Sequence, residues 1–292
     1  MPNFKNDRMR FPQRISRWLK GLRGYTHRND FSSIKSIVFF IGYPRSGHTL
    51  IGSLLDAHPE ILISHELDTL YYYDKLYTTT QIDELSLQNS IAFTKRGREW
   101  NGYNYYVPGQ YQGKYRNFRI IGDKSGGRTA RRMLINDFYQ LVSEIQDRTN
   151  RKIIFIHVIR NPYDTITTMM KRTIKRRNMD ETKDQLTLKI RHFFDHARGV
   201  LRIHEATNFT VIDIYHEDFV RRPVSELSHI CEQLGLTATN DYLEACNKIV
   251  WGKPKTSRQN SQLWTTYMID KVSKEMNSFP WFDRYDFDQN AK

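Results

Sequence analysis

The chain has 292 residues, of which 39% are hydrophobic and 13% aromatic, enough to form one large globular domain or two small ones. No segment reaches the roughly 18 consecutive apolar residues of a membrane span, no secretory signal is visible, and two cysteines exclude a disulfide framework and a cysteine metal site. We therefore expect a soluble, cytoplasmic protein, and its net charge of +13 favours an anionic partner: a nucleic acid, a phosphorylated cofactor, a sulfated glycan or an acidic membrane.

The first 30 residues form a basic segment, with eight Lys or Arg against two Asp. Apolar residues recur there at helical spacing, which predicts a short basic amphipathic helix built on Ile15, Trp18, Leu19 and Leu22. Such an arm could contact a membrane surface, dock elsewhere or fray. We interpret residues 1–30 as this arm and residues 31–292 as the domain.

Apolar patterns along the domain alternate between strand and helix periods, which predicts an α/β fold. The stretch KIIFIHVI is almost entirely apolar, as expected of a strand buried on both faces of a parallel sheet. The predicted strands are 37–41, 61–64, 119–122, 152–159 and 209–215. The predicted helices are 48–56, 128–147, 164–176, 184–206, 223–234, 239–249 and 265–277.

Residues 67–117 break this alternation and are rich in Tyr, Thr, Gly and Asn. We interpret them as an aromatic insertion over the carboxyl edge of the sheet, where open α/β folds bind ligands. Its tyrosines and Trp100 could stack on a sugar ring, a phenol or a flat lipid headgroup, or could pack within the insertion itself.

A strand, a glycine loop and a helix follow one another in IVFFIGYPRSGHTLIGSLLDAHPE. The spacing from Gly42 to Thr49 satisfies the frame of a triphosphate P-loop, but His48 replaces its lysine. Backbone N–H groups at the start of the helix would bind a phosphate. These donors belong to Arg45, Ser46, Gly47, His48 and Thr49. With Arg45 as the loop cation, the site suits a single 5′-phosphate that carries a transferable group, although an ordinary strand-to-helix turn stays open.

A second strand-to-helix turn places Arg160 directly after a strand and Thr165, Thr167 and Thr168 in the first turns of a helix. A guanidinium and a helix hydroxyl can bind one phosphate together. The alternative is an arginine that only caps a neighbouring carboxylate. Two such turns in one α/β chain favour a cofactor with two separate phosphates.

Both turns resemble signatures of the sulfotransferases. GYPRSGHTLIGSLLDAHPEI is similar to their 5′-phosphosulfate loop, most closely in its protein-tyrosine sulfotransferase-like or bacterial-type form. FIHVIRNPYDTITTMM resembles their 3′-phosphate signature, with Arg160 and Thr168 as ligands, and VIDIYHEDFVRRPVSELSHICEQLGL resembles a third segment. The resemblance covers residues 36–280 discontinuously. It implies a P-loop-like three-layer α/β fold, with a central parallel sheet flanked by helices, and sulfuryl transfer from 3′-phosphoadenosine 5′-phosphosulfate (PAPS) to an acceptor hydroxyl.

The resemblance also implies roles for side chains near the loop. Glu66 matches the general base of the tyrosine sulfotransferases, and His65 is the alternative, because histidine is the base in the cytosolic small-molecule branch. Neighbours in an extended segment point to opposite faces, so only one of them can face the acceptor. Arg45 and Lys124 would stabilise charge on the leaving phosphate, although Lys124 could also be a solvated loop residue.

Arg258 loosely matches an arginine that closes over the 3′-phosphate in the cytosolic sulfotransferases, and Lys255 is a secondary candidate. This segment departs from the family's Arg-Lys-Gly pattern. His48 is a further departure, which we expect to be tolerated if the backbone N–H does the binding. The scheme requires no metal, because cationic side chains and backbone donors stabilise the charge.

We expect the acceptor to be a carbohydrate, a glycolipid or a small molecule, because a basic surface suits an anionic glycan. Two other functions stay open. A P-loop nucleotide or small-molecule kinase would depend on ATP and magnesium, and the missing lysine argues against it. A basic nucleic-acid-binding protein would interleave basic and exposed aromatic residues, as residues 103–119 partly do, but no nucleic acid partner is expected.

Overall fold

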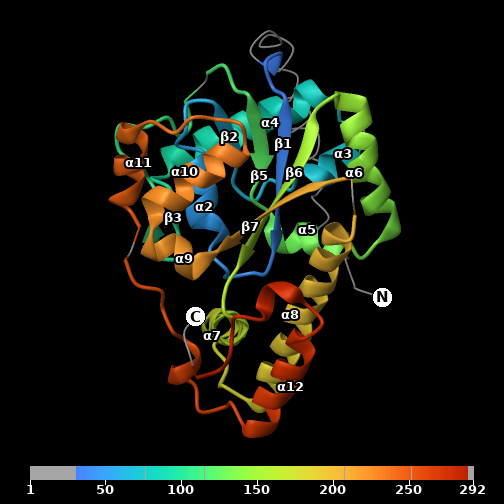
Figure 1. The fold of residues 1–292 in the computed structure, drawn as a ribbon, viewed down its shortest axis with the longest axis vertical. Helices are drawn as coiled ribbons and strands as arrows, with labels where there is room; N and C mark the ends of the chain where they lie inside the picture. Colours follow the sequence, from blue (N-terminus) through green and yellow to red (C-terminus); the bar gives the residue numbers. More distant parts are fainter. Residues whose placement is uncertain (1–30, 76, 115, 207, 251, 289–292) are drawn as a thin grey trace.

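The computed structural model describes residues 31–75, 77–114, 116–206, 208–250 and 252–288, so the predicted arm of residues 1–30 lies outside the described residues. The centre is a five-stranded sheet in the order β2-β5-β1-β6-β7 (Figure 1). Its strands are β1 (Ser36–Gly42), β2 (Ile61–Ser64), β5 (Ile120–Asp123), β6 (Lys152–Ile159) and β7 (Thr210–Tyr215). Every neighbouring pair is parallel, which confirms the predicted parallel sheet.

The middle strand β1 shows why both faces of the sheet must be covered. Alternate side chains of a strand point to opposite faces. Phe39 and Ile41 join one hydrophobic core, Val38 and Phe40 join a second, and all four side chains are fully buried. Apolar surface on both faces is stable only if helices pack on each of them.

Helices flank the sheet on both sides, so the chain has the predicted three-layer α/β fold (Figure 1). The core on the Val38 side includes residues of α2 (His48–Leu55), α9 (His216–Arg221), α10 (Pro223–Gln233) and α11 (Asn240–Asn247). The core on the Phe39 side includes residues of α3 (Thr69–Asp74), α4 (Thr79–Lys95), α5 (Gly126–Arg132), α6 (Asn136–Thr149), α7 (Pro162–Arg177), α8 (Lys183–His204) and α12 (Thr266–Met276).

The junction between β6 and α7 is determined by local sequence. Asn161 caps the helix, because its side chain accepts hydrogen bonds from the backbone N–H groups of Tyr163 (3.0 Å) and Asp164 (3.4 Å). Pro162 occupies the first helical turn, where its missing N–H costs nothing. Arg160 is therefore held at the carboxyl end of β6.

The first half of the segment 67–117 forms α3 and α4, which the sequence prediction missed. Helix α4 has weak apolar periodicity because it buries several polar or charged residues: Gln81, Asp83, Glu84 and Ser86. The buried carboxylate of Asp83 is paired with Arg151 at 2.7 Å. The capping box formed by Thr78 and Gln81 is the sequence signal that indicates this helix.

The second half of the segment forms a short antiparallel hairpin of β3 (Glu99–Trp100) and β4 (Tyr103–Asn104). The prediction also differs in two other places. The helix expected at 128–147 is interrupted at residues 133–135 and becomes α5 and α6, and the short helix α9 was not predicted. Within the described ranges, none of the helices combines the length and apolarity that crossing a bilayer requires.

Candidate active site

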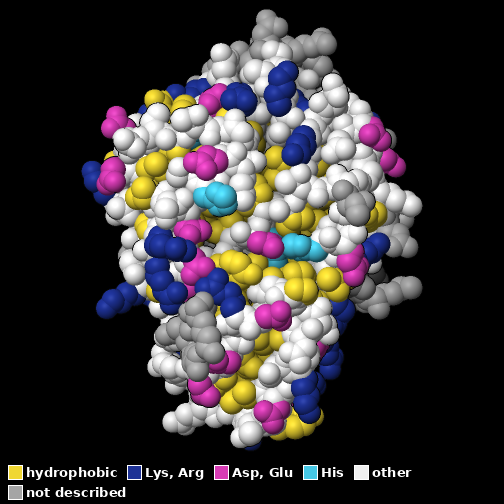
Figure 2. Space-filling view, in the orientation of Figure 1, with side chains coloured by type: hydrophobic (Ala, Val, Ile, Leu, Met, Phe, Trp, Pro, Cys, Tyr) yellow, Lys and Arg dark blue, Asp and Glu magenta, His cyan; other side chains and the backbone are white. Residues whose placement is uncertain are grey.

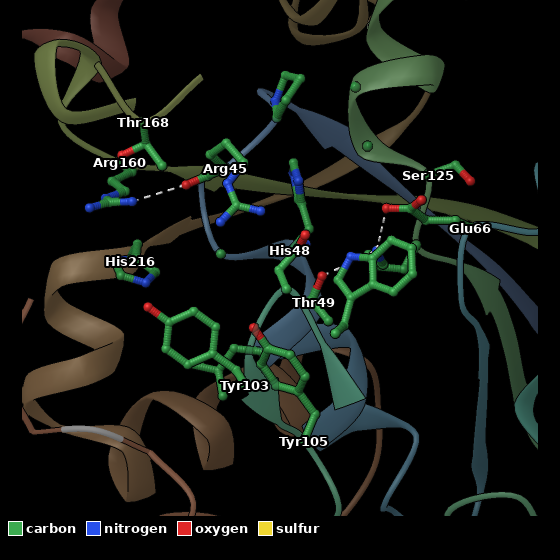
Figure 3. Close-up of a pocket in the computed structure, with 18 of the residues that line it drawn as sticks. Arg45, His48, Thr49, Glu66, Tyr103, Tyr105, Ser125, Arg160, Thr168 and His216 are labelled. Atoms are coloured by element: carbon green, nitrogen blue, oxygen red, sulfur yellow. Dashed lines mark hydrogen bonds and ion pairs between the residues drawn. The ribbon is translucent and has the colours of Figure 1, made fainter. Parts of the chain in front are cut away.

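A cavity of about 450 Å³ lies at the carboxyl edge of the sheet (Figure 3). Its walls come from the glycine loop, the turn after β2, the β3–β4 hairpin, the start of α5, the β6–α7 junction, α9 and residues 253–257. Both predicted phosphate-binding turns reach it, the first through Arg45 and Gly47 and the second through Arg160 and Thr168. The fold therefore brings two turns that are distant in sequence to one site.

Among the charged side chains that line the cavity, the basic ones are in the majority. They are Arg45, Lys124, Arg128, Arg131, Arg160, Lys253 and Lys255. Among the described residues that line the cavity, Glu66 is the only carboxylate. The site therefore suits an anionic ligand and offers one place for a carboxylate base.

The glycine loop has a tight turn at its centre. The backbone N–H and the hydroxyl of Ser46 both donate to the carbonyl of Tyr43, at 3.3 and 2.9 Å. Gly47 has a φ of 110°, and a Cβ there would lie 2.3 Å from Cδ2 of His216. Ser46 is fully buried and its side chain maintains the turn, while Gly47 is required by the close approach of His216.

His48, which replaces the P-loop lysine, lies with its ring between the loop and α5. Its Nε2 is 3.2 Å from the carbonyl oxygen of Ile41, and a Cβ at Gly126 would meet the ring at 2.6 Å. Burial, and to a lesser extent Lys124, lowers the pKa of His48 to about 3. The imidazole is therefore neutral at pH 7 and contributes no positive charge to the loop.

Arg45 provides the cation of the loop. Its Nε is buried and, among the described residues, has no hydrogen-bond partner. Burial lowers the pKa of this guanidinium, and Arg172 and Arg160 lower it further, whereas Tyr105 opposes the shift. A cation that is partly desolvated and surrounded by like charges gains interaction energy when an anion binds beside it.

Lys124 and Glu66 form an ion pair on the cavity wall (Figure 3). Lys124 Nζ donates to Glu66 Oε1 at 2.9 Å and to Thr49 Oγ1 at 3.2 Å. The lysine side chain is 5% exposed and the glutamate side chain 39% exposed. Burial lowers the pKa of Lys124, and Glu66 partly opposes this shift. The pair thus combines a buried cation with a carboxylate that remains open to the cavity.

Asp123 positions Glu66, and the sequence analysis missed this residue. Its carboxylate accepts backbone hydrogen bonds from Leu67 (3.1 Å), Asp68 (3.0 Å) and Thr69 (3.2 Å). These contacts wrap the chain around the end of β5 and place Glu66 in a left-handed conformation with φ of 53°. An aspartate directly before Lys124, at the end of a strand, is the signal that could have indicated it.

His65, the alternative base, does not line the cavity. Its ring stacks on Phe93 with centroids 3.9 Å apart and contacts Trp100 edge to face. Burial, with the nearby Lys124, lowers the pKa of His65 to about 2. The structure therefore brings Glu66 but not His65 to the cavity. The two side chains diverge because the chain makes a left-handed turn at Glu66, not because the segment is extended as predicted.

Arg160 is held by backbone oxygens at the opposite end of the cavity from Glu66 (Figure 3). It donates to the carbonyls of Arg45 (3.0 Å) and Lys255 (2.7 Å). Thr168 Oγ1 lies 3.0 Å from Ser257 Oγ, and both of these residues line the cavity. Arg160 thereby links the glycine loop to residues 253–257, and Ser257 is a polar group that the sequence analysis did not select.

Arg258 does not reach the cavity, so the prediction that it contacts the cofactor needs correction. Its side chain is completely buried and pairs with Asp164 at 2.5 Å. The backbone N–H of Arg258 also donates to Asp164, at 2.9 Å. Arg258 therefore anchors residues 257–258 to α7. It pairs with a neighbouring carboxylate, which is the alternative role that the sequence left open for Arg160.

His216 is a further cavity residue that the sequence analysis missed. It follows β7 directly and lies beside the glycine loop and Arg160 (Figure 3). Its Nδ1 is buried and, among the described residues, has no hydrogen-bond partner, and burial lowers its pKa to about 3. A neutral imidazole at this position can donate or accept one hydrogen bond from a ligand.

Comparison with known proteins relates one part of the chain to a known family. Residues 148–241 match the family model described as the sulfotransferase family, and this segment contains Arg160, Thr168 and His216. This part of the chain is therefore similar to the sulfotransferases. Among curated proteins, none matches the sequence.

Two solved structures share the sulfotransferase fold with the chain. The sulfotransferase domain from the curacin biosynthetic pathway is 15% identical, covers 84% of this chain and 97% of its own length, and has a TM-score of 0.50. Sulfotransferase STF9 from Mycobacterium avium is 12% identical, covers 96% of this chain and 86% of its own, and has a TM-score of 0.51. At sequence identities this low, the comparison shows a shared fold and nothing further.

Aromatic residues form part of the cavity wall. Trp100, Tyr103 and Tyr105 line it from the β3–β4 hairpin and the residue after it. Figure 3 shows Tyr103 and Tyr105 side by side. Lys255 Nζ is 2.9 Å from the hydroxyl of Tyr103. The hairpin therefore contacts the segment that also holds Arg160.

The exposed basic residues near α9 do not form an unbroken positive field. Arg221 and Arg284 pair with Asp218, and Arg222 pairs with Glu226. On the face drawn in Figure 2, basic side chains gather near α9 and are interspersed with acidic and hydrophobic ones. Among the described residues near α9, these ion pairs therefore reduce the local excess of positive charge.

Proposed function

We propose that this protein is a sulfotransferase, which transfers a sulfuryl group from PAPS to an acceptor hydroxyl. The proposal rests mainly on the presence of cations at two ends of one cavity, Arg45 and Lys124 at the glycine loop and Arg160 and Lys255 at the start of α7. PAPS carries anionic groups on both the 5′ and the 3′ side of its ribose. A donor with two anionic groups needs cations at two separate places.

The residues at the glycine loop fit the 5′-phosphosulfate. Helix α2 begins at His48, and the first N–H groups of a helix have no acceptor within the helix. The unpartnered Nε of Arg45 lies in the same loop. We propose that these groups hold the 5′ end, and that Arg160, Thr168 and Lys255 hold the 3′-phosphate.

PAPS supplies an activated sulfuryl group on its 5′-phosphate. Glu66, the cavity carboxylate, would accept the proton of the acceptor hydroxyl. Lys124 would orient this carboxylate through the 2.9 Å ion pair. Arg45 and Lys124 would stabilise the negative charge that develops on the 5′-phosphate.

The acceptor site would lie on the Glu66 side of the cavity. Trp100, whose ring contacts His65 next to Glu66, offers an aromatic face there, which suits a sugar ring or another flat group. Arg128 lies beside Glu66, with Nη1 3.4 Å from the glutamate carbonyl oxygen. We propose a carbohydrate, glycolipid or small-molecule hydroxyl as the acceptor, and the basic wall would favour one that carries negative charge.

Donor binding is tested by calorimetry with 3′-phosphoadenosine 5′-phosphate (PAP) and with 5′-AMP. Each charge-assisted hydrogen bond contributes about 1.5–3 kcal/mol, so PAP should bind at least about tenfold more tightly than 5′-AMP. Equal affinity for the two nucleotides would contradict the assignment of the 3′-phosphate. The comparison with ATP and Mg²⁺ tests the kinase alternative, which predicts that ATP binds more tightly than PAP.

Transfer itself is tested with PAPS that carries radiolabelled sulfur and a panel of sugars, glycolipids and phenols. Label on an acceptor would support the proposed reaction, and mass spectrometry of the product would identify the sulfated hydroxyl. PAP binding without transfer to any acceptor would support the donor site and contradict the proposed activity on these acceptor classes.

A further inference from the structure

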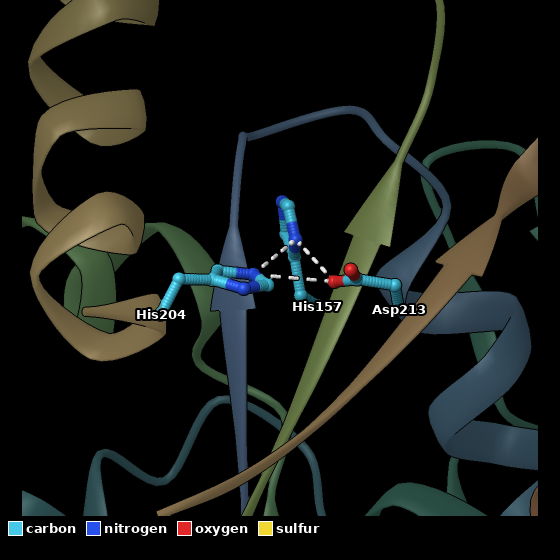
Figure 4. A group of neighbouring side chains, drawn as sticks. All are labelled: His157, His204 and Asp213. Atoms are coloured by element: carbon cyan, nitrogen blue, oxygen red, sulfur yellow. Dashed lines mark hydrogen bonds and ion pairs between the residues drawn. The ribbon is translucent and has the colours of Figure 1, made fainter. Parts of the chain in front are cut away.

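A second polar cluster lies between the sheet and α8, apart from the proposed transfer site. It consists of His157 on β6, Asp213 on β7 and His204 in the last turn of α8 (Figure 4). None of the three residues lines the cavity that contains Arg45 and Glu66. The sheet register brings two of them together, because His157 pairs with Asp213 across β6 and β7.

Three ligand atoms converge in this cluster. His157 Nδ1 lies 2.8 Å from Asp213 Oδ1. His204 Nε2 lies 3.3 Å from the same carboxylate oxygen and 3.3 Å from His157 Nδ1. In Figure 4 the three side chains point toward one another from three different elements. Nitrogen and oxygen atoms that all face one point can form a ligand set for a cation.

These separations agree with the geometry of a tetrahedral metal site. Bonds of about 2.0 Å to nitrogen and oxygen ligands place those ligands about 3.3 Å apart at tetrahedral angles. A triangle with sides of 2.8, 3.3 and 3.3 Å has a circumscribed radius of about 1.8 Å. A point about 2.0 Å from all three atoms therefore exists, about 0.8 Å out of their plane.

Hydrogen bonds alone satisfy this arrangement less well. If both imidazoles donate to Asp213 Oδ1, the N–H groups of His157 and His204 converge on one oxygen with their nitrogens only 3.3 Å apart. If one imidazole instead donates to the other, neither of these nitrogens has a hydrogen left for the carboxylate. A bound cation removes this conflict, because all three atoms then direct lone pairs at it.

The surroundings of the cluster fix the two rings. His157 Nε2 lies 3.3 Å from the hydroxyl of Tyr43, which accepts a hydrogen bond from Trp281 Nε1 at 2.8 Å. The ring of His204 stacks on Trp281, with centroids 4.7 Å apart. A hydrogen bond to the second nitrogen of a ligating histidine is typical of metal sites, because it fixes the tautomer and the ring orientation.

Exposure of the cluster is graded from the sheet outward. The side chain of His157 is fully buried, that of His204 is 23% exposed and that of Asp213 is 36% exposed. An ion could therefore approach from the Asp213 side and keep a water molecule as a fourth ligand. Two imidazoles and one carboxylate suit a borderline divalent cation such as Zn²⁺ rather than Mg²⁺ or Ca²⁺, which prefer oxygen ligands.

We propose that His157, His204 and Asp213 bind one Zn²⁺-class divalent cation, with water as the fourth ligand. The ion would link α8 to β6 and β7. Through the hydrogen bond between His157 and Tyr43 it would also reach the residue directly before Pro44 and Arg45 of the glycine loop. The site supports the fold beneath the loop and does not depend on sulfuryl transfer.

The test titrates Co²⁺ into the full chain after removal of bound metal by a chelator and of any histidine tag. Tetrahedral Co²⁺ absorbs visible light much more strongly than the hydrated ion, and Zn²⁺ should displace it. We expect one Co²⁺ per chain with a tetrahedral spectrum. An octahedral spectrum, or no saturable binding, would overturn the proposal.

Two variants and a matched control locate the site. His204→Gln and Asp213→Asn each remove one partly exposed ligand and should weaken Co²⁺ binding at least about tenfold. His229→Gln removes a histidine on α10 whose side chain is 63% exposed, and it should bind Co²⁺ as the wild type does. Equal weakening in all three variants, or in none of them, would overturn the proposal.

Thermal unfolding provides a readout that is independent of the spectrum. Zn²⁺ at about 100 times its dissociation constant should raise the Tm of the wild type by about 5 °C. The Asp213→Asn variant should fold without metal, as near-ultraviolet circular dichroism can verify, but its Tm should not respond to Zn²⁺. A metal-free wild type whose Tm does not change with Zn²⁺ would contradict the proposed link between α8 and the sheet.

Discussion

The two ends of the cavity hold their cations in different ways. At one end Lys124 is paired with Glu66, a carboxylate that can take up a proton. At the other end Arg160 is held by the carbonyls of Arg45 and Lys255, which do not titrate. The first arrangement can respond to proton transfer during a reaction, whereas the second keeps the same charge and position throughout. The difference separates an end suited to chemistry from an end suited to anchoring a phosphate.

The largest effect on activity is expected from replacing Glu66, the proposed base. Glu66→Gln keeps the shape of the side chain but cannot accept a proton, so kcat should fall by about 10²–10⁴-fold while the Kd of PAP changes little. Steady-state transfer and calorimetry measure the two quantities. Glu232→Gln, on a side chain that is 69% exposed, serves as the control and should be fully active. Near-normal kcat in Glu66→Gln would remove Glu66 from the mechanism.

Arg258→Gln tests whether this arginine is structural. The substitution leaves the carboxylate of Asp164 buried and unpaired, which costs about 3–5 kcal/mol of unfolding free energy. Denaturant unfolding should show this loss, while the preference for PAP over 5′-AMP should persist in the protein that remains folded. A stable variant that no longer distinguishes the two nucleotides would return Arg258 to the cofactor site.

Arg160→Gln tests the anchoring end. If Arg160 holds the 3′-phosphate as proposed, the affinity for PAP should fall by about ten- to a hundredfold and the affinity for 5′-AMP should change much less. Arg177→Gln, at an exposed position in the last turn of α7, is the matched control. If Arg160→Gln weakened both nucleotides equally, the arginine would support the loop rather than the phosphate.

A smaller effect concerns pH, because His48 is held neutral in the fold. Its pKa of about 3 lies below that of a histidine in the unfolded chain, so the unfolded chain binds the proton first as the pH falls below about 6.5. This one histidine should therefore cost about 2 kcal/mol of stability between pH 6.5 and pH 5. Denaturant unfolding of the wild type and His48→Gln at both pH values measures the difference. An equal pH dependence in the two proteins would show that His48 is not the responsible group.

Sequence patterns predicted the sheet well, for a physical reason. Strands β2 and β6 coincide with the predicted ranges, because a strand buried on both faces consists mainly of apolar residues; Ser64 and His157 are buried polar exceptions. Helix α4 was missed because tertiary ion pairs such as Asp83 with Arg151 let it bury charged residues that no periodicity reveals. Local sequence patterns therefore predict a buried element only when its buried side chains are apolar.

The candidate site was predictable where motifs are local, as in the glycine loop and the β6–α7 junction. The sequence predicted that Arg160 and Arg258 both contact the 3′-phosphate. The difference between them is visible only in the structure, where Asp164 binds Ser257 and Arg258. The left-handed turn at Glu66 depends on Asp123, a residue on another strand. Long-range hydrogen bonds of this kind leave no spacing signal in the chain.

The contact between His48 and Gly126 also limits how this sequence can diverge. A methyl group at position 126 would lie 2.6 Å from the imidazole, so a larger residue at 126 requires the ring of His48 to move. A residue larger than glycine at position 126 would be selected against while histidine is at position 48. A residue smaller than histidine at position 48 would make room for a larger one at 126. Among homologues, positions 48 and 126 should therefore covary. A smaller side chain at one position should accompany a larger side chain at the other.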